Sequence, residues 1–548
     1  MNDIHPIILE ILKNRGITEE SDLVEFLAEK PNRTYDPFLL KNLEAGVDFL
    51  LSAIKQERKI CIYGDYDADG VTSVSLLMQV LSHLTTNLTY YIPSRFDEGY
   101  GLNKDAIDQI KRDGAELIVT VDCGSVSYEE VEYGKGIGID FIVTDHHNIN
   151  DKPADCILIN PKQQDCQYPF KHLAGCGVAF KLAQGLQRKA NLPKSMLTEV
   201  LDLVAIATIG DIVPLIDENR TLTKYGLGVI RAGKRPGLQK LIREVGLTSD
   251  KIKSETIAYI IVPHLNAAGR MLDARIGVEL LTSKDEGTIV LHTAEMIRKN
   301  KERKRIQEEA FQKCKELIAE KLTQDLFYVI DADDIHEGIA GIVAGKIKEE
   351  YGRPTIIVTE SGGDGFLKGT GRSINTLNLY ELLKKNERLF LKFGGHSGAC
   401  GFLMQSENLQ ILRKSLNDEI ERLLQDNEAL FDSELFVDLE LEGKQVDKRL
   451  AMELEKLAPF GCENERPLFR VKGIKPNNVS FMGTDKQHVR FSGTGVAGRG
   501  LSCILFQSAQ TYSQHLLSGT LLDLVGYPDI NEWNGESKIQ FVLKGITY

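Results

Sequence analysis

The sequence lacks the features that mark several common classes of protein. None of its nine cysteines forms a Cys-x-x-Cys pair, so neither a zinc-binding framework nor a disulfide framework is indicated. No apolar run approaches the roughly 20 residues that a transmembrane helix needs. Residues 1–5 also lack the basic segment and apolar core that begin a secretory signal. We therefore expect a cytoplasmic protein with reduced cysteines.

A surplus of basic residues is absent as well. The 66 Lys and Arg residues stand against 79 Asp and Glu residues, which gives a net charge of −13. Non-specific binding to nucleic acid depends on Lys and Arg that meet phosphates, so this charge excludes a uniformly basic, DNA-coating protein. A local basic groove is compatible with it, and bound metal ions would neutralise part of the acidic surplus.

Acidic residues are concentrated directly after apolar runs that are typical of buried strands. In an α/β enzyme, ligands are usually placed where strands emerge from the sheet. We therefore expect the acidic groups after four such runs to converge on one site. The runs and the residues that follow them are 59–63 before Asp65-Tyr66-Asp67-Ala68-Asp69-Gly70, 117–121 before Asp122, 141–144 before Asp145-His146-His147, and 203–210 before Asp211.

This concentration of charge predicts a metal site. Asp65, Asp67 and Asp69 lie within five residues, and like charges about 4 Å apart cost several kcal/mol at intermediate dielectric unless cations lie between them. Carboxylates with one or two histidines suit Mn²⁺ or Mg²⁺. A shared carboxylate such as Asp122 could hold two ions about 3.5–4 Å apart, the arrangement that hydrolyses phosphate esters.

Two other interpretations of the first acidic motif explain less. Asp-x-Asp-x-Asp-Gly also begins a calcium-binding EF-hand loop, but the twelfth position, which should be Glu, is Leu76. Capping of a helix that begins near Thr72 would explain one aspartate and not three. For the adjacent histidines we expect different roles, because neighbouring side chains of an extended chain point to opposite sides. His146 would bind metal, and His147 would face substrate or a carboxylate.

The pattern along the chain predicts an α/β protein of several domains. Strands alternate with helical stretches over residues 58–215, which indicates a mostly parallel sheet. A second α/β unit and a small all-β barrel follow after one long charged helix, whose basic stretch 298–305 is either a solvated face or a DNA contact. We expect an N-terminal helical segment at 1–55, a catalytic domain at 56–284, the connecting helix at 285–325, the second α/β domain at 326–432 and the barrel at 433–548.

The acidic motifs also resemble those of a known family. Residues 64–70, 121–124, 144–147 and 210–215 resemble the four motifs of the DHH phosphoesterase superfamily. In order and spacing they are most similar to the bacterial RecJ exonuclease family, and further motifs agree at 93–101, 265–270, 336–344, 394–401 and 458–461. The chain departs from the family pattern after Gly461, where Cys462-Glu463-Asn464-Glu465-Arg466-Pro467 replaces a run of small residues.

The resemblance implies roles for individual residues. The metal ligands would be Asp67, Asp69, Asp122, His146 and Asp211, and the catalytic residues beside them would be Asp65, Asp145 and His147. Substrate would be bound by Arg95, Arg270, His336, Arg372, Ser373, Gly394, Gly395 and His396, with the first two at a 5′ phosphate. Arginine offers a fixed fork of donors for phosphate, and glycine lets the backbone approach one. Without the resemblance, the glycine-rich loops would be read as tight turns.

The resemblance further implies a metal-dependent exonuclease that degrades single-stranded DNA from its 5′ end in DNA repair and recombination, with two Mn²⁺ or Mg²⁺ ions. The C-terminal barrel would be an OB-fold that binds the strand, and a single-strand-binding protein and a helicase would be partners. Two alternatives use the same fold. One is a DHH-type nanoRNase or cyclic-dinucleotide phosphodiesterase, and the other is a non-catalytic scaffold that binds DNA.

Overall fold

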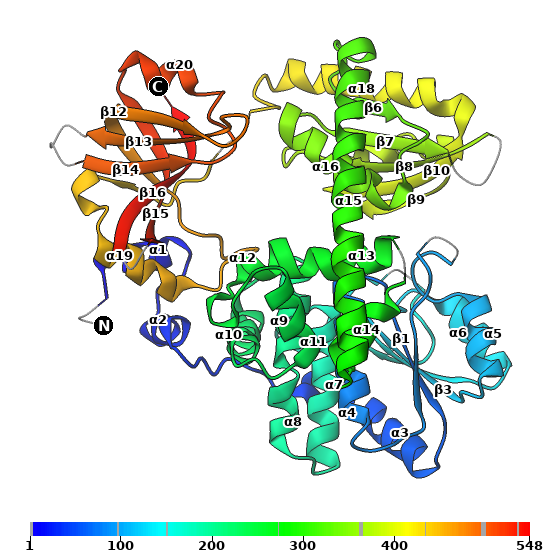
Figure 1. Ribbon diagram of the computed structural model, residues 1–548. Helices are drawn as coiled ribbons and strands as arrows, with labels where there is room; N and C mark the ends of the chain where they lie inside the picture. The colour runs from blue at the N-terminus through cyan, green and yellow to red at the C-terminus, as the bar shows by residue number, and fades with distance from the viewer. Residues whose placement is uncertain are drawn as a thin grey trace. The chain divides into compact units, whose positions relative to one another are not determined.

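The chain folds into two compact units, which are described separately. The computed structural model describes residues 4–95, 98–149, 152–271, 273–360, 365–432, 435–494, 500–533 and 536–547. The first unit comprises Met1–Pro263, Gly277–Val290 and Leu435–Tyr548, and the second comprises His264–Ile276 and Leu291–Glu434 (Figure 1). Within the described ranges, no helix has both the length and the apolar character needed to span a membrane.

The first unit contains the predicted parallel sheet. Its order is β2-β1-β3-β4-β5, and every neighbouring pair is parallel. One face is covered by α5 (Lys104–Arg112) and α6 (Tyr128–Gly136), and the other by α3 (Leu43–Lys55), α4 (Ala68–Leu81) and α7 (Gly175–Lys189). The strands are β1 (Ile60–Gly64), β2 (Leu88–Tyr91), β3 (Leu117–Val121), β4 (Asp140–Thr144) and β5 (Ile157–Ile159).

The fourth apolar run does not form a strand. Residues 203–210 belong to helix α9 (Leu201–Gly210), and Asp211 follows the end of that helix. The prediction of a strand was wrong because the run is apolar all round, and a fully buried helix and a fully buried strand then share one pattern. The helix packs against α4, α7, α8 (Lys194–Glu199), α10 (Asp217–Arg231) and the π-helix η3 (Ile257–Ile261). The other helices of this region are α11 (Pro236–Glu244), α12 (Ser254–Thr256), α13 (Val262–Met271) and α14 (Arg275–Thr282).

The second unit contains a mixed sheet with the order β6-β7-β8-β10-β9. Only β6 and β7 are parallel, and the remaining neighbours are antiparallel. Residues of α15 and α16 pack on one face, and α17 and α18 pack on the other. The elements are α15 (Glu286–Lys321), β6 (Tyr328–Asp331), α16 (Glu337–Tyr351), β7 (Thr355–Glu360), β8 (Phe366–Arg372), α17 (Leu379–Lys384), β9 (Phe390–His396), β10 (Ala399–Gln405) and α18 (Leu409–Asp426).

The long helix α15 is the one that the sequence predicted, and three basic residues of stretch 298–305 pair with acidic residues along the helix. Arg298 contacts Glu295 at 2.6 Å, Lys299 contacts Glu302 at 3.1 Å, and Arg305 contacts Glu309 at 2.6 Å. Pairs three or four residues apart stabilise an isolated helix by about 0.2–0.5 kcal/mol each. These contacts favour a solvated face for Arg298 and Arg305, whereas Arg303 is buried and donates to Asn300 and Gln307.

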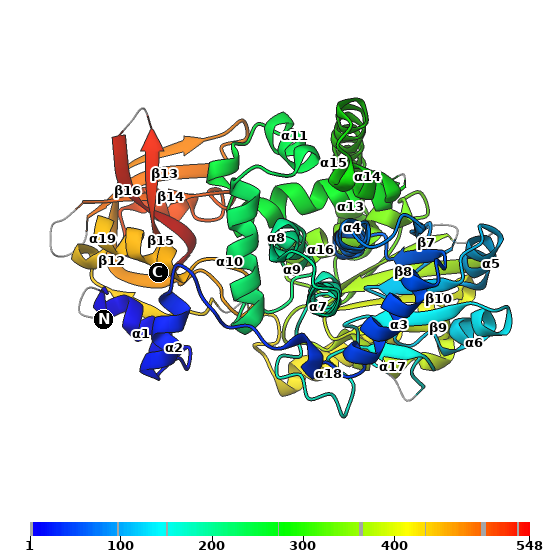
Figure 2. The ribbon, with the colours of Figure 1, turned by 90° about the horizontal axis from the view of Figure 1, so that it is seen from below.

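The C-terminal part of the first unit is a five-stranded β-barrel with one added strand. The strand order is β11-β12-β13-β14-β16-β15, and a further pairing of β12 with β15 closes the barrel. The N-terminal helices α1 (Pro6–Asn14) and α2 (Glu20–Leu27) lie beside the barrel in Figure 2, and their buried side chains belong to its hydrophobic core. The other elements are β11 (Leu439–Leu441), α19 (Lys448–Leu454), η7 (Glu455–Leu457), β12 (Phe469–Met482), β13 (His488–Thr494), β14 (Gly500–Leu505), α20 (Ser513–Ser518), β15 (Leu522–Trp533) and β16 (Glu536–Thr547).

Candidate active site

The acidic motifs of the first unit meet in one buried cluster. Asp65, Asp122 and Asp145 follow the carboxyl ends of β1, β3 and β4, as predicted. Asp211 joins them from the end of helix α9. Their ligand atoms fall into overlapping groups that lie within 4.8 Å of one another. These groups are Asp122 with Asp145, His146 and His147; Asp69 with His146 and Asp211; and Asp65 with Asp67 and Asp122.

Helix α4 fixes the first acidic motif. Asp67 is its N-cap, and the carboxylate accepts hydrogen bonds from the amides of Asp69 at 2.9 Å and Gly70 at 3.2 Å. Gly70 is required here because a Cβ would lie 2.3 Å from the carbonyl oxygen of Asp65. The capping interpretation is therefore correct for Asp67, which also belongs to a ligand group with Asp65 and Asp122. Asp65 and Asp69 do not cap the helix and have other contacts.

Asp69 is held by a segment distant in sequence. Its two carboxylate oxygens accept from the amides of Gly175 and Cys176, each at 2.7 Å, at the start of α7. A side chain at position 175 would place its Cβ 2.6 Å from the Cβ of Asp122. The sequence analysis missed this support, and the glycine pair at 175 and 177 was the available signal.

His146 lies at the centre of the cluster. Its Nε2 atom is 3.1 Å from Asp122 Oδ1, 3.5 Å from Asp211 Oδ2 and 3.9 Å from Asp69 Oδ2. This buried nitrogen forms no hydrogen bond, and neither does the buried Oδ1 of Asp65. Burial, together with the charge of His147, lowers the pKa of His146 to about 3, so the imidazole is neutral at physiological pH. A neutral imidazole aimed at carboxylates is the arrangement of a metal ligand.

The carboxylates cannot all carry charge without a cation. Burial raises the pKa of Asp69 to about 7 and that of Asp211 to about 8, and neighbouring aspartates add to both shifts. Burial also raises the pKa of Asp65 and of Asp122 well above the usual range. Oxygen donors with one imidazole are the set that Mn²⁺ and Mg²⁺ accept. The residues present therefore fit a pair of divalent cations, with Asp122 and His146 shared between ligand groups.

His147 has the opposite electrostatic setting. Its Nδ1 lies 2.8 Å from Asp145 Oδ1, and 45% of its side chain is exposed. Burial opposes its charge, but the hydrogen bond and the negative charge of Asp145 raise the pKa of His147 to about 9. Although burial alone would raise the pKa of Asp145, the same bond and the charge of His147 lower it. The pair is therefore an ionised dyad at the surface of the cluster.

Several groups that hold this dyad were missed by the sequence analysis. The hydroxyl of Tyr100 lies 3.2 Å from Nδ1 and 3.3 Å from Nε2 of His147. The amide of Ser125 donates to Asp145 Oδ2 at 2.9 Å. Asn160 donates to the carbonyl of His147 at 2.9 Å. Asn160 directly follows β5, so a polar residue after the last apolar run of the sheet was the available signal.

Arg95 lies near the acidic cluster in the first unit. Its guanidinium is 5.1 Å from the centre of the Tyr66 ring, and its charge favours ionisation of Asp65. A cation in this position suits a phosphate that approaches the cluster. Contact between Arg95 and a substrate stays a prediction.

The substrate-binding residues predicted in the second unit lie in two neighbouring groups. Arg270 donates to the carbonyl of Gly338 at 2.9 Å, and His336 caps α16 by accepting from the amide of Gly338 at 3.1 Å. Arg372 extends over the same helix, because a Cβ on Gly341 would lie 2.9 Å from its Nη2. Both arginines thus lie against the N-terminal part of α16, where amides and guanidinium groups suit an anion.

The glycine-rich loop adjoins that group at one end of the sheet. Arg372 pairs in register with Ala399 of β10, which pairs in turn with His396 of β9. Gly395 has a φ of +143°, and a Cβ there would lie 2.3 Å from the carbonyl oxygen of Ala399. Gly394 has open space around it. The amide of Ser373 donates to the carbonyl of Gly398 at 3.0 Å, and its buried hydroxyl donates to the carbonyl of Leu377 at 2.9 Å, so this residue joins two parts of the loop.

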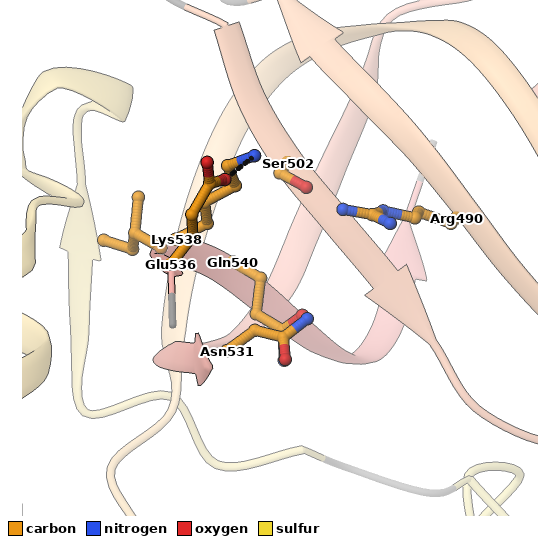
Figure 3. A pocket seen from close by; sticks show the side chains of 7 residues that line it. Arg490, Ser502, Asn531, Glu536, Lys538 and Gln540 are labelled. Carbon is orange, nitrogen blue, oxygen red and sulfur yellow. Dashed lines mark ion pairs between the residues drawn. The ribbon is translucent and has the colours of Figure 1, made fainter. Parts of the chain in front are cut away.

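The barrel has a polar pocket of about 340 Å³. In Figure 3, Asn531 and Gln540 lie beside each other on the β15–β16 hairpin, with Arg490 of β13 across from them. Lys538 forms an ion pair with Glu536 at 2.7 Å. No aromatic side chain is among the described residues of the lining, which are Arg490, Ser502, Asn531, Glu536, Lys538, Ile539 and Gln540.

Comparison with known proteins agrees with this architecture. Residues 59–208 match the model of the DHH family N-terminal domain, residues 322–422 match the DHHA1 domain, and residues 437–545 match the RecJ OB domain. The parallel sheet with its acidic cluster is thus the core of a DHH-family protein.

Whole-chain relatives narrow the assignment. The single-stranded-DNA-specific exonuclease RecJ of Bacillus subtilis (strain 168) is 36% identical over 99% of this chain and 68% of the relative. The protein of the same description from Escherichia coli (strain K12) is 34% identical over 85% of this chain and 83% of the relative. The crystal structure of RecJ from Thermus thermophilus in complex with Mn²⁺ matches with a TM-score of 0.84 at 27% identity, over all of this chain and 76% of that one. The chain belongs to the RecJ family.

Proposed function

We propose that the protein is a metal-dependent exonuclease that degrades single-stranded DNA from its 5′ end, in DNA repair and recombination. The observation that carries this proposal is the neutral His146, whose unbonded Nε2 lies within 4 Å of three aspartates. The family relatives act on single-stranded DNA by name, and a RecJ structure also exists in complex with Mg²⁺. Polarity from the 5′ end rests on the resemblance of the motifs.

We assign two Mn²⁺ or Mg²⁺ ions to five ligands. When bound, these ions would neutralise charge on the scissile phosphate and acidify a water molecule. Asp65, which lies in one ligand group with Asp67 and Asp122 and whose buried Oδ1 has no hydrogen bond, would act beside these ligands. The proposed ligands are Asp67, Asp69, Asp122, His146 and Asp211.

The dyad of Asp145 and His147 would act on the substrate. Because the pKa of His147 is about 9, the ring carries two protons at neutral pH. One proton is held against Asp145 Oδ1, so the Nε2 proton, which lies near the Tyr100 hydroxyl, would be the one donated to a phosphate oxygen or to the departing 3′ oxygen. The hydroxyl of Tyr100 would keep the ring in this orientation.

We assign substrate binding to three groups of residues. From the resemblance of the motifs we assign recognition of the 5′ phosphate to Arg95 and Arg270. The polar pocket of the barrel would bind the strand through hydrogen bonds and charge, because its described lining offers no aromatic platform. The remaining groups, in the second unit, would bind backbone phosphates, and these are His336, Arg372, Ser373, Gly394, Gly395 and His396.

We also propose a separate role for each domain of the chain. Residues 56–284 would carry catalysis, 285–325 would connect, 326–432 would bind substrate, and 433–548 would bind the strand, with 1–55 as a helical addition. From the family resemblance we propose a cytoplasmic location and a single-strand-binding protein and a helicase as partners. Pull-down of each purified partner with this chain would test the last point.

One experiment tests the activity directly. Single strands labelled at the 5′ or the 3′ end, a blunt duplex and a dinucleotide are incubated with the protein, with and without Mn²⁺. We expect Mn²⁺-dependent release of the 5′ label as mononucleotide, with the duplex intact. Hydrolysis of the dinucleotide alone would favour a nanoRNase, and inertness toward all four substrates would favour a scaffold.

A further inference from the structure

The turn at residues 461–464, which precedes β12 of the barrel, contacts the loop at residues 211–216, which begins with Asp211. The amide of Leu215 donates to the carbonyl of Cys462 at 2.8 Å. A Cβ on Gly461 would lie 2.3 Å from Leu215 Cδ1 and 3.3 Å from its Cγ. Leu215 is only 2% exposed, so its side chain has little room to move away. Two residues far along the chain thus confine the end of the loop.

The loop itself is strained beside Asp211. Ile212 has a φ of 57° and is 73% exposed. A β-branched residue in this left-handed region is an outlier that persists only where the surroundings enforce it. Upstream, the amide of Asp211 is held by Ala207 of α9 at 2.8 Å. Downstream, Asn219 donates to the carbonyl of Pro214 at 3.0 Å, beside the contact of Leu215 with the turn.

Hydrogen bonds hold the turn in place, so it can limit the movement of the loop. Gly461 and Asn464 exchange two backbone hydrogen bonds of 3.1 Å. The buried side chain of Asn464 donates to the carbonyls of Leu457 at 3.0 Å and Pro459 at 2.8 Å, and it accepts from Arg15 at 3.1 Å. Arg220 of α10 donates to Leu457 at 2.9 Å. The turn is therefore fixed both to the N-terminal helix and to the helices of the catalytic domain.

We propose that Gly461 and Cys462 are positioning residues for the metal centre, because they hold the strained loop that presents Asp211. The segment that precedes β12 would thus stabilise the catalytic site. This role would be separate from any contact that the barrel makes with DNA. It rests on the proposed metal site. Groups that orient metal ligands typically change metal affinity or activity by about 10–100-fold when they are altered.

The test measures Mn²⁺ affinity in the full chain by electron paramagnetic resonance of free Mn²⁺. Gly461→Ala is compared with Gly443→Ala, because a Cβ on Gly443 would meet nothing within 4 Å and neither glycine has a left-handed φ. We expect Gly461→Ala to weaken Mn²⁺ binding about tenfold and to lower kcat about tenfold. The KM for single-stranded DNA should change less than twofold. Gly443→Ala should match the unmodified protein in all three quantities.

A second variant separates positioning from loss of folding. Leu215→Val lacks the Cδ1 atom that an alanine at position 461 would meet, so Gly461→Ala with Leu215→Val should regain most of the Mn²⁺ affinity. Equal Mn²⁺ affinity of Gly461→Ala and Gly443→Ala, or no recovery in the double variant, would overturn the inference. If the proposed metal site itself were wrong, the unmodified protein and Asp211→Ala would bind Mn²⁺ with the same affinity. That result is distinct from the two outcomes that would overturn the positioning role of Gly461.

Discussion

Two buried groups of charged side chains in the first unit differ in how their charge is balanced. Lys181 and Glu218 are fully buried and form an ion pair, and Glu218 also accepts from the hydroxyl of Tyr168 and the amide of Tyr35. In the cluster of Asp65, Asp69, Asp122 and Asp211, like charges face one another, and the central His146 is neutral. The first group is satisfied within the protein, whereas the second needs cations from outside.

The difference shows how burial can serve either structure or chemistry. A buried charge is costly unless a partner of opposite sign and sufficient hydrogen bonds accompany it. Lys181 meets this condition with Glu218 and with the carbonyl of Tyr35 at 3.1 Å. The acidic cluster meets it only as a metal site. Changes in either group should therefore have different consequences.

The largest effect is expected from Asp122→Asn. This change removes a shared carboxylate, so nuclease activity should fall about 10⁴-fold. In EDTA at pH 8.5 the variant should be at least as stable to heat as the unmodified protein, because a source of repulsion is gone. Labelled-DNA assays and calorimetry measure the two effects. The exposed Asp105→Asn serves as the control, and equal activity of both variants would rule out the assignment of Asp122.

Lys181→Met should have the largest effect on stability. It leaves Glu218 buried without its counter-ion, which typically costs about 3–5 kcal/mol of the free energy of unfolding. Denaturant titration measures this loss. Lys189→Met is the matched control, because Lys189 pairs with Asp48 at 2.7 Å and with Glu44 at 3.0 Å at the surface, where such pairs are worth about 0.2–1 kcal/mol. Similar losses in both variants would contradict the comparison.

His147→Gln should lower kcat about 10²-fold or more, as expected on loss of a proton donor. Mn²⁺ affinity should change little, because His147 is paired with Asp145 and is not among the proposed ligands. Single-turnover kinetics and Mn²⁺ titration test both statements. The exposed His172→Gln is the control. A loss of Mn²⁺ binding as large as that of His146→Ala would instead make His147 a ligand.

The contrast also predicts a pH dependence of the metal-free protein. The folded-state pKa values of Asp69 and Asp211 are raised to about 7 and 8, and that of His147 is raised to about 9. All three groups bind protons more tightly in the folded state than in the unfolded state, so stability should fall as the pH rises from 6.5 to 9. His146, with a lowered pKa of about 3, is neutral in both states over this range.

Addition of Mn²⁺ should abolish or reverse that slope, because metal binding displaces protons from the ligands and strengthens as the pH rises. The measurement is the melting temperature at several pH values, in EDTA and in Mn²⁺. If the slope were the same under both conditions, the raised pKa values would not belong to a metal site.

Part of this protein was determined locally by the sequence. The apolar runs at β1, β3 and β4 form buried strands, and the acidic residues after them lie at the carboxyl edge of the sheet, because each strand end and its next residues are adjacent along the chain. The charged helix α15 and the short alternating strands of the barrel follow from period and composition in the same way. The donor set for a divalent metal could also be read from residue types alone.

Only the tertiary structure decided the remaining features. The run before Asp211 is uniformly apolar and has no period, so its helical form depended on the helices that surround it. Asp69 is held by amides more than 100 residues away, at Gly175 and Cys176. The contact of Gly461 with Leu215 spans an even longer separation. Such approaches depend on how elements pack, and the pattern of residues within each element does not record them.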